Sequence, residues 1–345
     1  MLALSFGGDG VEIKRGVPRL ADVARLAGVS PITASRVVRG EGPIAEATRQ
    51  RVLDAVQQLG YVPNRAAGAL ASSSSKLIGV LIPSLTNIVF PDVLRGINVA
   101  LAASGYQALV GVTEYDPRIE QEIVASLLAW NPEALILTGF DHTDATRRML
   151  DNHKVRIAEL MEIDETPIDV AVGLSHPKAG LEIGRHLIAK GYRKFGYVGH
   201  DWRADRRSRL RYDGLRAALA DHGLSIVAEH YSEGPSSIQK GRQSLASLLE
   251  QGRELDVVVF SNDDMAVGGY LHCVAAGLAV RDDLALFGFN GLEIGEALPH
   301  ALSTIYSDRF RIGKIAAEKL LEQKSRPAEQ TIIDIGFVLR EGQTA

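Results

Sequence analysis

The sequence predicts a chain of two parts with different fold classes: a small all-α head, followed by a large α/β body with two doubly wound parallel sheets. Two short helical patterns joined by a tight glycine turn stand near the N-terminus. From about residue 77 onward, short apolar runs typical of strands alternate with helical patterns. The length of 345 residues also suits about two domains at roughly 100–200 residues each.

The net charge of −4 on the whole chain hides a division between these two parts. Residues 11–76 contain ten basic and five acidic side chains, so this segment carries +5, whereas residues 77–345 carry −8. A basic module on an acidic body is typical of a protein whose head binds a polyanion such as nucleic acid. Chance clustering of charges on a solvated surface is the alternative interpretation.

Composition and simple patterns argue against several other classes of protein. The chain is 46% hydrophobic and 23% charged, as ordinary globular proteins are, and unlike disordered or collagen-like chains. It has no run of 18 apolar residues for a membrane span, and its N-terminus lacks the features of a signal peptide. The single cysteine, Cys273, cannot form an internal disulfide, which fits a cytoplasmic protein. Residues 1–16 are expected to form a loose tail.

The head, residues 17–63, is predicted to be a helix-turn-helix module. Residues 20–27 have the apolar spacing of a helix, and Gly28 supplies a turn after them. Ser30 and Pro31 are typical of the start of a second helix, as its N-cap and its first helical residue. This helix is expected to reach about residue 39, with a basic and polar outer face.

A third helix is expected over about residues 45–59, closed by Gly60 as a C-cap. Two short helices joined by a tight turn, with a polar second helix, form the unit that enters the major groove of DNA. A three-helix bundle with no role in DNA binding would give a similar pattern, but the basic face favours the DNA-binding interpretation.

The body, residues 77–345, is predicted to contain parallel sheets covered by helices on both faces, because strands and helices alternate. The expected strands are residues 77–82, 106–112, 134–137, 156–160, 194–198, 225–231, 257–260, 285–288, 303–305 and 331–337. Examples of the expected helices are residues 92–104, 118–130, 178–190, 208–221 and 264–276. So long a body is large for one sheet, and two doubly wound subdomains facing a cleft fit better.

Ligands of open α/β sheets bind outside the carboxyl ends of the strands, so polar loops there are candidate binding segments. One such loop follows the first strand and contains Ser84 and Thr86, with the aromatic Phe90 after it. Another, residues 261–266, follows the strand at 257–260.

Several motifs resemble the LacI/GalR family of bacterial repressors. They are the stretch from Leu20 to Ser30, the run Ser35-Arg36-Val37-Val38, and the run Gly60-Tyr61-Val62-Pro63-Asn64-Arg65. The match continues along the chain from about residue 17. It implies a body with the periplasmic-binding-protein-like type I fold, crossed three times by the chain. The N-subdomain would be about 77–175 and 306–333, and the C-subdomain about 176–305 and 334–345.

The resemblance implies that seven positions at the second helix contact DNA: Ser30, Pro31, Ile32, Thr33, Ser35, Arg36 and Arg39. Arg36 matches the family's guanine-reading arginine, whose forked guanidinium suits two acceptors on one base. Pro31 and Ile32 lack a side-chain donor, so they can offer only apolar contact, for instance to a thymine methyl group. This departs from family members with polar residues there.

Residues 64–76 resemble the family's hinge helix and a following Ser-rich linker. The resemblance gives Asn64 and Arg65 to the DNA contact. Leu70 matches the side chain that two paired hinge helices insert into the central base step from the minor groove.

In the body, the resemblance implies effector contacts from Arg209, Arg211, Asn262, Asn290 and Arg309, in addition to the three polar-loop residues. Asn290 stands where many members have an aspartate, and Arg309 stands near the position of a pocket-wall aromatic. An added cation and a lost anion favour an anionic effector. The alternatives are that the arginines of residues 206–211 form a solvated turn and that Asn262 caps a helix.

Hydroxyl-binding side chains beside arginines suit a sugar acid. Six segments also resemble the gluconate-operon repressor subgroup: residues 78–87, 93–97, 105–107, 135–138, 169–173 and 334–337. We therefore expect a homodimeric repressor that binds a palindromic operator and responds to gluconate or a related keto-sugar acid. Neither a cofactor nor a metal is indicated.

Other functions are compatible with parts of the pattern. A regulator of another sugar, or one that needs a co-repressor, shares every motif above. A periplasmic solute-binding protein shares the body but needs a signal peptide and no head. An enzyme is disfavoured because no Walker loop, G-x-S-x-G elbow or metal-spaced His/Cys cluster is found. His176, His186 and His200 are accordingly interpreted as surface or core residues.

Overall fold

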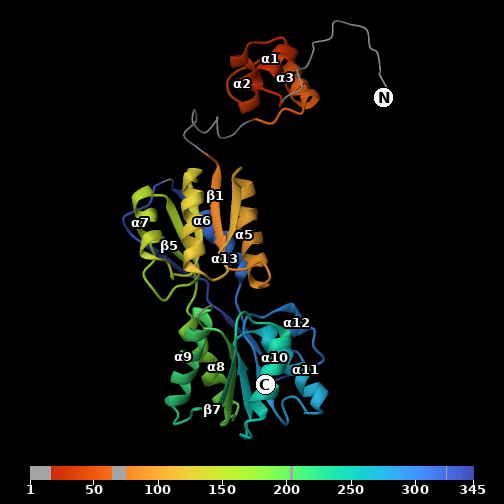
Figure 1. Ribbon diagram of the computed structural model, residues 1–345, viewed down its shortest axis with the longest axis vertical. Helices are drawn as coiled ribbons and strands as arrows, with labels where there is room; N and C mark the ends of the chain where they lie inside the picture. Colours follow the sequence, from red (N-terminus) through yellow and green to blue (C-terminus); the bar gives the residue numbers. More distant parts are fainter. Residues whose placement is uncertain (1–16, 64–74, 203–204, 324) are drawn as a thin grey trace, which may run out of the picture. The chain divides into compact units, whose positions relative to one another are not determined.

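The computed structural model describes residues 17–63, 75–202, 205–323 and 325–345. The chain divides into two compact units, Met1–Ser75 and Lys76–Ala345. The described part of the first unit is all helical, whereas the second contains parallel sheets covered by helices (Figure 1). The predicted fold class, an all-α head and a doubly wound α/β body, is thereby confirmed.

The described part of the first unit has three helices packed around a small apolar core: α1 (Leu20–Ala27), α2 (Pro31–Arg39) and α3 (Glu46–Leu59). Helix α1 ends at Gly28, whose φ of 63° is in the left-handed region that glycine adopts easily. Ser30 caps α2, because its Oγ accepts a hydrogen bond from the backbone N–H of Thr33 at 3.2 Å. The predicted helix-turn-helix is therefore present with its expected turn and cap.

The first sheet of the body has six parallel strands in the order β11-β5-β4-β3-β1-β2. They are β1 (Leu77–Ile82), β2 (Gln107–Val112), β3 (Ala134–Thr138), β4 (Arg156–Glu162), β5 (Val170–Leu174) and β11 (Thr331–Asp334). Helices α5 (Val89–Ala103) and α13 (Arg309–Glu322) cover one face, and α6 (Pro117–Ala129) and α7 (Asp144–His153) cover the other (Figure 1).

Alternation along the strands supplies the two cores of this sheet. Val80 and Ile136 belong to the apolar cluster that includes α5 and α13, whereas Leu81 and Leu135 belong to the cluster with α6 and α7. Successive side chains of a strand point to opposite faces, so apolar runs of this kind bury both faces of the sheet.

The second sheet has four parallel strands in the order β7-β6-β8-β9. They are β6 (Phe195–His200), β7 (Ile226–Ser232), β8 (Val257–Phe260) and β9 (Ala285–Phe287). Helices α8 (His176–Ala189) and α9 (Arg206–Ala220) pack together on one face, and α10 (Ile238–Leu249) and α11 (Asp263–Ala276) on the other. The short α12 (Glu293–Glu296) packs against α11.

Three segments connect the two sheets. The chain passes from β5 into α8, from β10 (Thr304–Tyr306) into α13, and from β11 into β12 (Val338–Arg340). Strands β10 and β12 pair antiparallel to each other. The last residues then bond to the second sheet, since the N–H of Leu286 donates to the carbonyl oxygen of Thr344 at 2.8 Å.

The paired helices approach so closely that only glycine fits at their contacts. A Cβ atom on Gly180 of α8 would lie 1.9 Å from the carbonyl oxygen of Arg211 on α9, and one on Gly214 would lie 2.2 Å from that of Pro177. The same reciprocal arrangement holds for Gly96 and Gly313 between α5 and α13, and for Gly241 and Gly268 between α10 and α11.

Most expected strands are present, with ends that shift by one or two residues. Strand β5 was not predicted, because Val170–Leu174 is a short apolar run without alternation, as befits a strand buried on both faces. The expected strand at 331–337 ends early, at Asp334, because Gly336 has a φ of 71° and turns the chain. Among the described residues, no helix is both long and apolar enough to cross a bilayer.

Candidate functional site: an exposed helix face and a cleft between two sheets

The outward face of α2 is polar and basic. Ile32 is 69% exposed, and Arg36 and Arg39 are exposed beside it. The side-chain hydroxyls of Ser30 and Thr33 are 2.9 Å apart, and Ser35 is half-buried. Pro31 occupies the first helical position and is exposed. Five of the seven expected contact positions are therefore exposed, and Thr33 and Ser35 are half-buried.

Arg36 has no described ion-pair partner, whereas other arginines of this unit have one. Arg39 pairs with Glu41 at 3.2 Å, and Arg25 pairs with Asp22 at 2.9 Å. A guanidinium without a carboxylate partner can offer both donors of its fork to one base edge. The roles expected for Asn64, Arg65 and Leu70 lie outside the described residues.

In the body, Arg211 lies in a cleft between the two sheets. Its guanidinium donates hydrogen bonds to the carbonyl oxygen of Ser261 at 2.8 Å and to Nδ1 of His176 at 3.1 Å. It also lies over the ring of Phe289, 4.0 Å from the centroid, in a cation–π contact. These three contacts fix the plane of the guanidinium, as recognition of a carboxylate requires.

His176 is neutral in this arrangement. Burial lowers its pKa well below the usual value, and the charges of Arg211 and Arg207 lower it further. Its Nε2 lies 2.9 Å from the carbonyl oxygen of Met161, so Nε2 carries the proton and Nδ1 accepts from Arg211. The interpretation of His176 as an ordinary core or surface residue is therefore incomplete, because it orients the cleft arginine.

Asp205 is the counter-charge that two of the cleft arginines share. Its carboxylate lies 3.5 Å from Nε of Arg207 and 3.9 Å from Nη2 of Arg211, and it caps α9 through Ser208. Burial raises the pKa of Asp205, but a hydrogen bond from His200 and the two arginines outweigh this and hold it well below its usual range. Asp205 thus lies beside both guanidinium groups, while Glu162 also acts on the charge of Arg207 and Asp263 on that of Arg211.

Asn262 and Asn290 provide amides on the same side of the cleft. Asn262 caps α11, because its Oδ1 accepts from the N–H of Met265 at 3.4 Å, as the alternative interpretation predicted. Asn290 has a φ of 120°, a conformation that favours glycine, and its N–H donates to the carbonyl oxygen of Ile305 at 2.8 Å. The chain thus holds the Asn290 side chain at the edge of the cleft.

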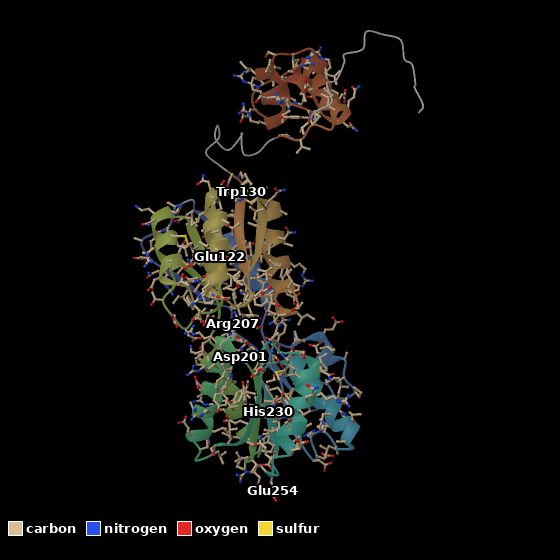
Figure 2. The ribbon with its side chains drawn as sticks, viewed as in Figure 1. Glu122, Trp130, Asp201, Arg207, His230 and Glu254 are labelled. Atoms are coloured by element: carbon tan, nitrogen blue, oxygen red, sulfur yellow. The ribbon has the colours of Figure 1, made fainter. Side chains whose placement is uncertain are left out.

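These residues surround a cavity of about 30 Å³ that both sheets line. From the first sheet come Asn87, Val89 and Met161, and from the second come Asp205, Arg207, Arg211, His176, Phe289, Asn262 and Asn290. Of the eight expected effector contacts, the structure brings Arg211, Asn262 and Asn290 together. Figure 2 shows Arg207 where the two halves of the body meet.

The expectation that Arg209 contacts the effector needs correction, because the structure does not place this side chain in the cleft. Its side chain is 64% exposed and lies 4.0 Å from Asp213 on the same helix. Residues two positions apart on a helix point to opposite sides, whereas those four apart share a face. Arg207 and Arg211 therefore point into the cleft together, and Arg209 points away.

The other expected contacts lie around the cleft without lining it. Arg309 donates to the carbonyl oxygen of Asn290 and lies 3.3 Å from Asp92, so it supports the cleft residue from behind. Phe90 is buried beneath Arg207, whose guanidinium is 5.8 Å from the ring centroid. Ser84 and Thr86 hydrogen-bond to each other at 3.0 Å in a more exposed loop.

Only some of the cleft residues that sequence analysis did not identify could have been found from local patterns. The four-residue spacing of Arg207 and Arg211 was the available signal, but the predicted helix began at residue 208 and so left Arg207 out, whereas α9 begins at Arg206. His176, Asp205 and Phe289 depend on contacts between distant segments, which local patterns do not encode. Within the described chain, no cluster of three or more His, Cys, Asp or Glu residues could hold a metal ion.

Comparison with known proteins matches both units. Residues 19–64 match the model for bacterial regulatory proteins of the lacI family. Residues 75–341 match the model for periplasmic binding proteins and the sugar binding domain of the LacI family. The chain is also 37% identical over 334 residues to the HTH-type transcriptional regulator GntR of Escherichia coli K12, covering 96% of this chain and 99% of that protein.

Two solved structures extend the likeness to three dimensions. A LacI-family transcriptional regulator from Silicibacter pomeroyi superposes with a TM-score of 0.89 at 39% identity, over 95% of this chain and 99% of that one. The lac repressor dimer bound to operator and the anti-inducer ONPF superposes with a TM-score of 0.83 at 27% identity, over the same shares of the two chains.

Proposed function

This chain belongs to the LacI family of bacterial regulatory proteins, and from that premise we propose that a small sugar acid in the cleft controls its operator affinity. The chain is a DNA-binding transcriptional regulator with a helix-turn-helix head. Gluconate or a close relative is the proposed effector, and the cytoplasm the proposed location.

The observation that supports this proposal is the pair of guanidinium groups in the cleft. Arg207 and Arg211 share one carboxylate, Asp205, and the guanidinium of Arg211 is held by three contacts. A carboxylate ligand can accept two parallel hydrogen bonds from such a fork. Asn262 and Asn290 add neutral amides that can bond to ligand hydroxyls without repelling an anion.

The mechanism follows from linkage between two binding sites. An effector lowers operator affinity only if it binds more tightly to a conformation in which the two heads of a dimer are poorly positioned for binding the operator. Asn87 and Met161, from the half with the first sheet, line the same cavity as Arg211 and Asn262, from the half with the second. A ligand that contacts both sides therefore favours one relative position of the two sheets.

We also propose that a homodimer binds a palindromic operator, since half-sites mirror the two-fold axis of a dimer. The lac repressor structure, a dimer bound to operator, supports this by analogy. In each half-site Arg36 would bond to guanine, and Pro31 and Ile32 would contact thymine methyl groups. Asn64, Arg65 and Leu70 of the hinge segment would contribute to the same complex.

Titration of the operator-bound protein with gluconate tests the proposal. Release of DNA at rising gluconate concentration is expected, and fluorescence anisotropy of a labelled operator measures it. Tighter DNA binding on adding gluconate would identify the co-repressor alternative instead. A thermal-shift screen of neutral sugars and sugar acids tests the effector class, because a ligand that binds only the folded state raises its melting temperature.

A further inference from the structure

The first strand of the body begins after a lysine in the left-handed conformation. Lys76 is the first residue of the second compact unit and directly precedes β1, and its φ is 55°. This conformation is easy for glycine and uncommon for a residue with a Cβ atom. Such a residue keeps it only where neighbouring contacts hold it in place. Because the chain enters the body at Lys76, these contacts set the direction of the chain at that point.

Glu133 holds the backbone of Lys76 from one side of β1. The N–H of Lys76 donates to Oε1 of Glu133 at 3.1 Å. Glu133 directly precedes β3, and its own N–H donates to the carbonyl oxygen of Leu77 at 2.9 Å. One residue thus bonds to two successive residues at the start of β1, once through its side chain and once through its backbone.

Tyr106 completes the group from the other side of β1. Its hydroxyl donates to Oε2 of Glu133 at 2.7 Å, and Nζ of Lys76 lies 4.2 Å from the centroid of its ring, in a cation–π contact. Burial raises the pKa of Tyr106 to about 12, and the bond to Glu133 adds to the rise, so the hydroxyl keeps its proton. The N–H of Gln107 donates to the carbonyl oxygen of Lys76 at 3.0 Å. Both polar backbone groups of Lys76 are therefore bonded.

Lys76, Tyr106 and Glu133, here called the junction cluster, lie at the amino ends of three neighbouring strands. In the sheet, β1 stands between β2 and β3, and each residue of the cluster directly precedes one of these strands. The strands are parallel, so their carboxyl ends lie at the opposite edge of the sheet. The junction cluster is therefore at the edge where the chain arrives from the head, away from the carboxyl ends of these strands.

We propose that the junction cluster fixes the direction in which the chain leaves the body, and so determines how well the two heads of a dimer reach both halves of an operator. Glu133 is then a positioning residue for DNA binding, because it acts through the backbone of Lys76. This inference rests on the proposed homodimer and palindromic operator.

The physical reason is that binding of the second head is an intramolecular step once the first head is bound. The strength of that step depends on the effective concentration of the free head at its half-site. A fixed chain direction at Lys76 reduces the conformational freedom that the connecting segment loses on binding. Disrupting the junction cluster should therefore weaken binding to a complete palindrome, and leave the binding of a single head to one half-site unchanged.

Glu133→Ala and Glu133→Gln test the inference as a charge-matched pair of full-length proteins. Both remove one negative charge, but only glutamine keeps an oxygen that can accept from the N–H of Lys76. The probes are a palindromic duplex that the wild-type protein enriches from a random pool, and a duplex with one half of that palindrome. Fluorescence anisotropy should show Glu133→Ala binding the palindrome about fivefold more weakly than wild type, and the half-site within twofold. Glu133→Gln should bind both duplexes within twofold of wild type.

Lys76→Gly and Lys154→Gly form a second matched pair. Lys154 is also an exposed lysine in the left-handed conformation, with a φ of 51°, two residues before β4 of the same sheet. Both substitutions remove a positive charge and ease the backbone conformation, but only Lys76 stands where the chain enters the body. Lys76→Gly should weaken palindrome binding about fivefold, because the cation–π contact is lost and the backbone gains freedom. Lys154→Gly should change it less than twofold.

Several results would overturn the role of the junction cluster. Equal losses on the palindrome and the half-site, or equal losses in Lys76→Gly and Lys154→Gly, would assign the effect to charge or to general weakening of the body. Palindrome affinity at the wild-type level in Glu133→Ala would also overturn it, and would leave the proposed dimer intact. If Glu133→Ala does not fold, as urea unfolding would show, the lysine pair decides. A wild-type protein that binds the palindrome no better than the half-site would overturn both proposals.

Discussion

Arg309 and Asp92, 217 positions apart in the sequence, form an ion pair at 3.3 Å between α13 and α5. The same guanidinium also donates to the carbonyl oxygen of Asn290, in the segment that follows β9 of the second sheet. One buried arginine thus ties together three segments that local sequence patterns treat as independent.

Replacing this arginine should destabilise the body. Arg309→Met removes both bonds and leaves the carbonyl oxygen of Asn290 without its partner, so we expect a loss of about 2 kcal/mol. Urea unfolding of the wild type and the variant measures it. Arg311→Met, at an exposed position on the same helix, serves as the control and should change stability by less than about 0.5 kcal/mol. Similar losses in the two variants would contradict the role given to Arg309.

Substitutions of Arg211 and Arg209, on different sides of α9, should have different effects on the response to gluconate. Arg211→Lys keeps the charge but loses the fork, so the gluconate concentration for half-release of the operator should rise about tenfold or more. Arg209→Ala should respond as wild type does, because that side chain is 64% exposed and pairs only with Asp213. Operator anisotropy at increasing gluconate gives both values. A larger effect from Arg209→Ala would refute the placement of the site.

Arg36 should affect the choice of DNA sequence more than general affinity. Arg36→Met should cost about 1–3 kcal/mol on the operator and much less on a scrambled duplex. Arg49→Met removes the same charge from α3 and is the control for the electrostatic part of binding. The ratio of the two dissociation constants is the readout, and an equal change of that ratio in both variants would rule out base reading by Arg36.

The buried His142 lies 2.7 Å from Glu120 and 3.2 Å from Glu159. These contacts predict a specific dependence of stability on pH. The pKa of His142 is raised to about 9 in the folded chain, against 6.5 for the free side chain, so its contribution is complete below pH 6.5. It is lost as the pH rises through about 9. Between pH 7.5 and 9 we expect the free energy of unfolding to fall by about 2 kcal/mol.

This window lies above the pKa of about 7 for Glu162, so His142 dominates the slope there. Urea unfolding at several pH values measures it. The variant His142→Gln should be less stable throughout and should lose most of the slope between pH 7.5 and 9. A slope that persists unchanged in His142→Gln would assign the dependence to other groups.

Local signals were enough to predict the head. Gly28, Ser30 and Pro31 specify a turn, a cap and a first helical position through their own backbone preferences. Local signals also predicted most strands of the body, because a short apolar run between two helical patterns has few interpretations other than a strand. Strand β5 escaped prediction, since a short apolar run with a glycine has no period of its own.

The site was predictable only where a residue carries its own chemistry. Arg211, Asn262 and Asn290 were identified from family likeness, and they meet in the cleft. Arg209 was misplaced, because likeness in sequence did not take account of which face of α9 each arginine occupies. Asp205 was missed, because its role depends on segments that meet only in the folded chain.

The glycine pairs between neighbouring helices restrict how the body can rearrange. Because α8 and α9 touch backbone to backbone at Gly180 and Gly214, they have no layer of side chains along which to slide. Shear between packed helices is therefore blocked in the second sheet, and the same holds for α5 and α13 in the first. Opening or closing of the body is then expected to use the three connecting segments as hinges. The arginines at the start of α9 then move with the second sheet as one rigid body. A new effector specificity can therefore be acquired by exchanging these side chains without changing the closing motion of the body.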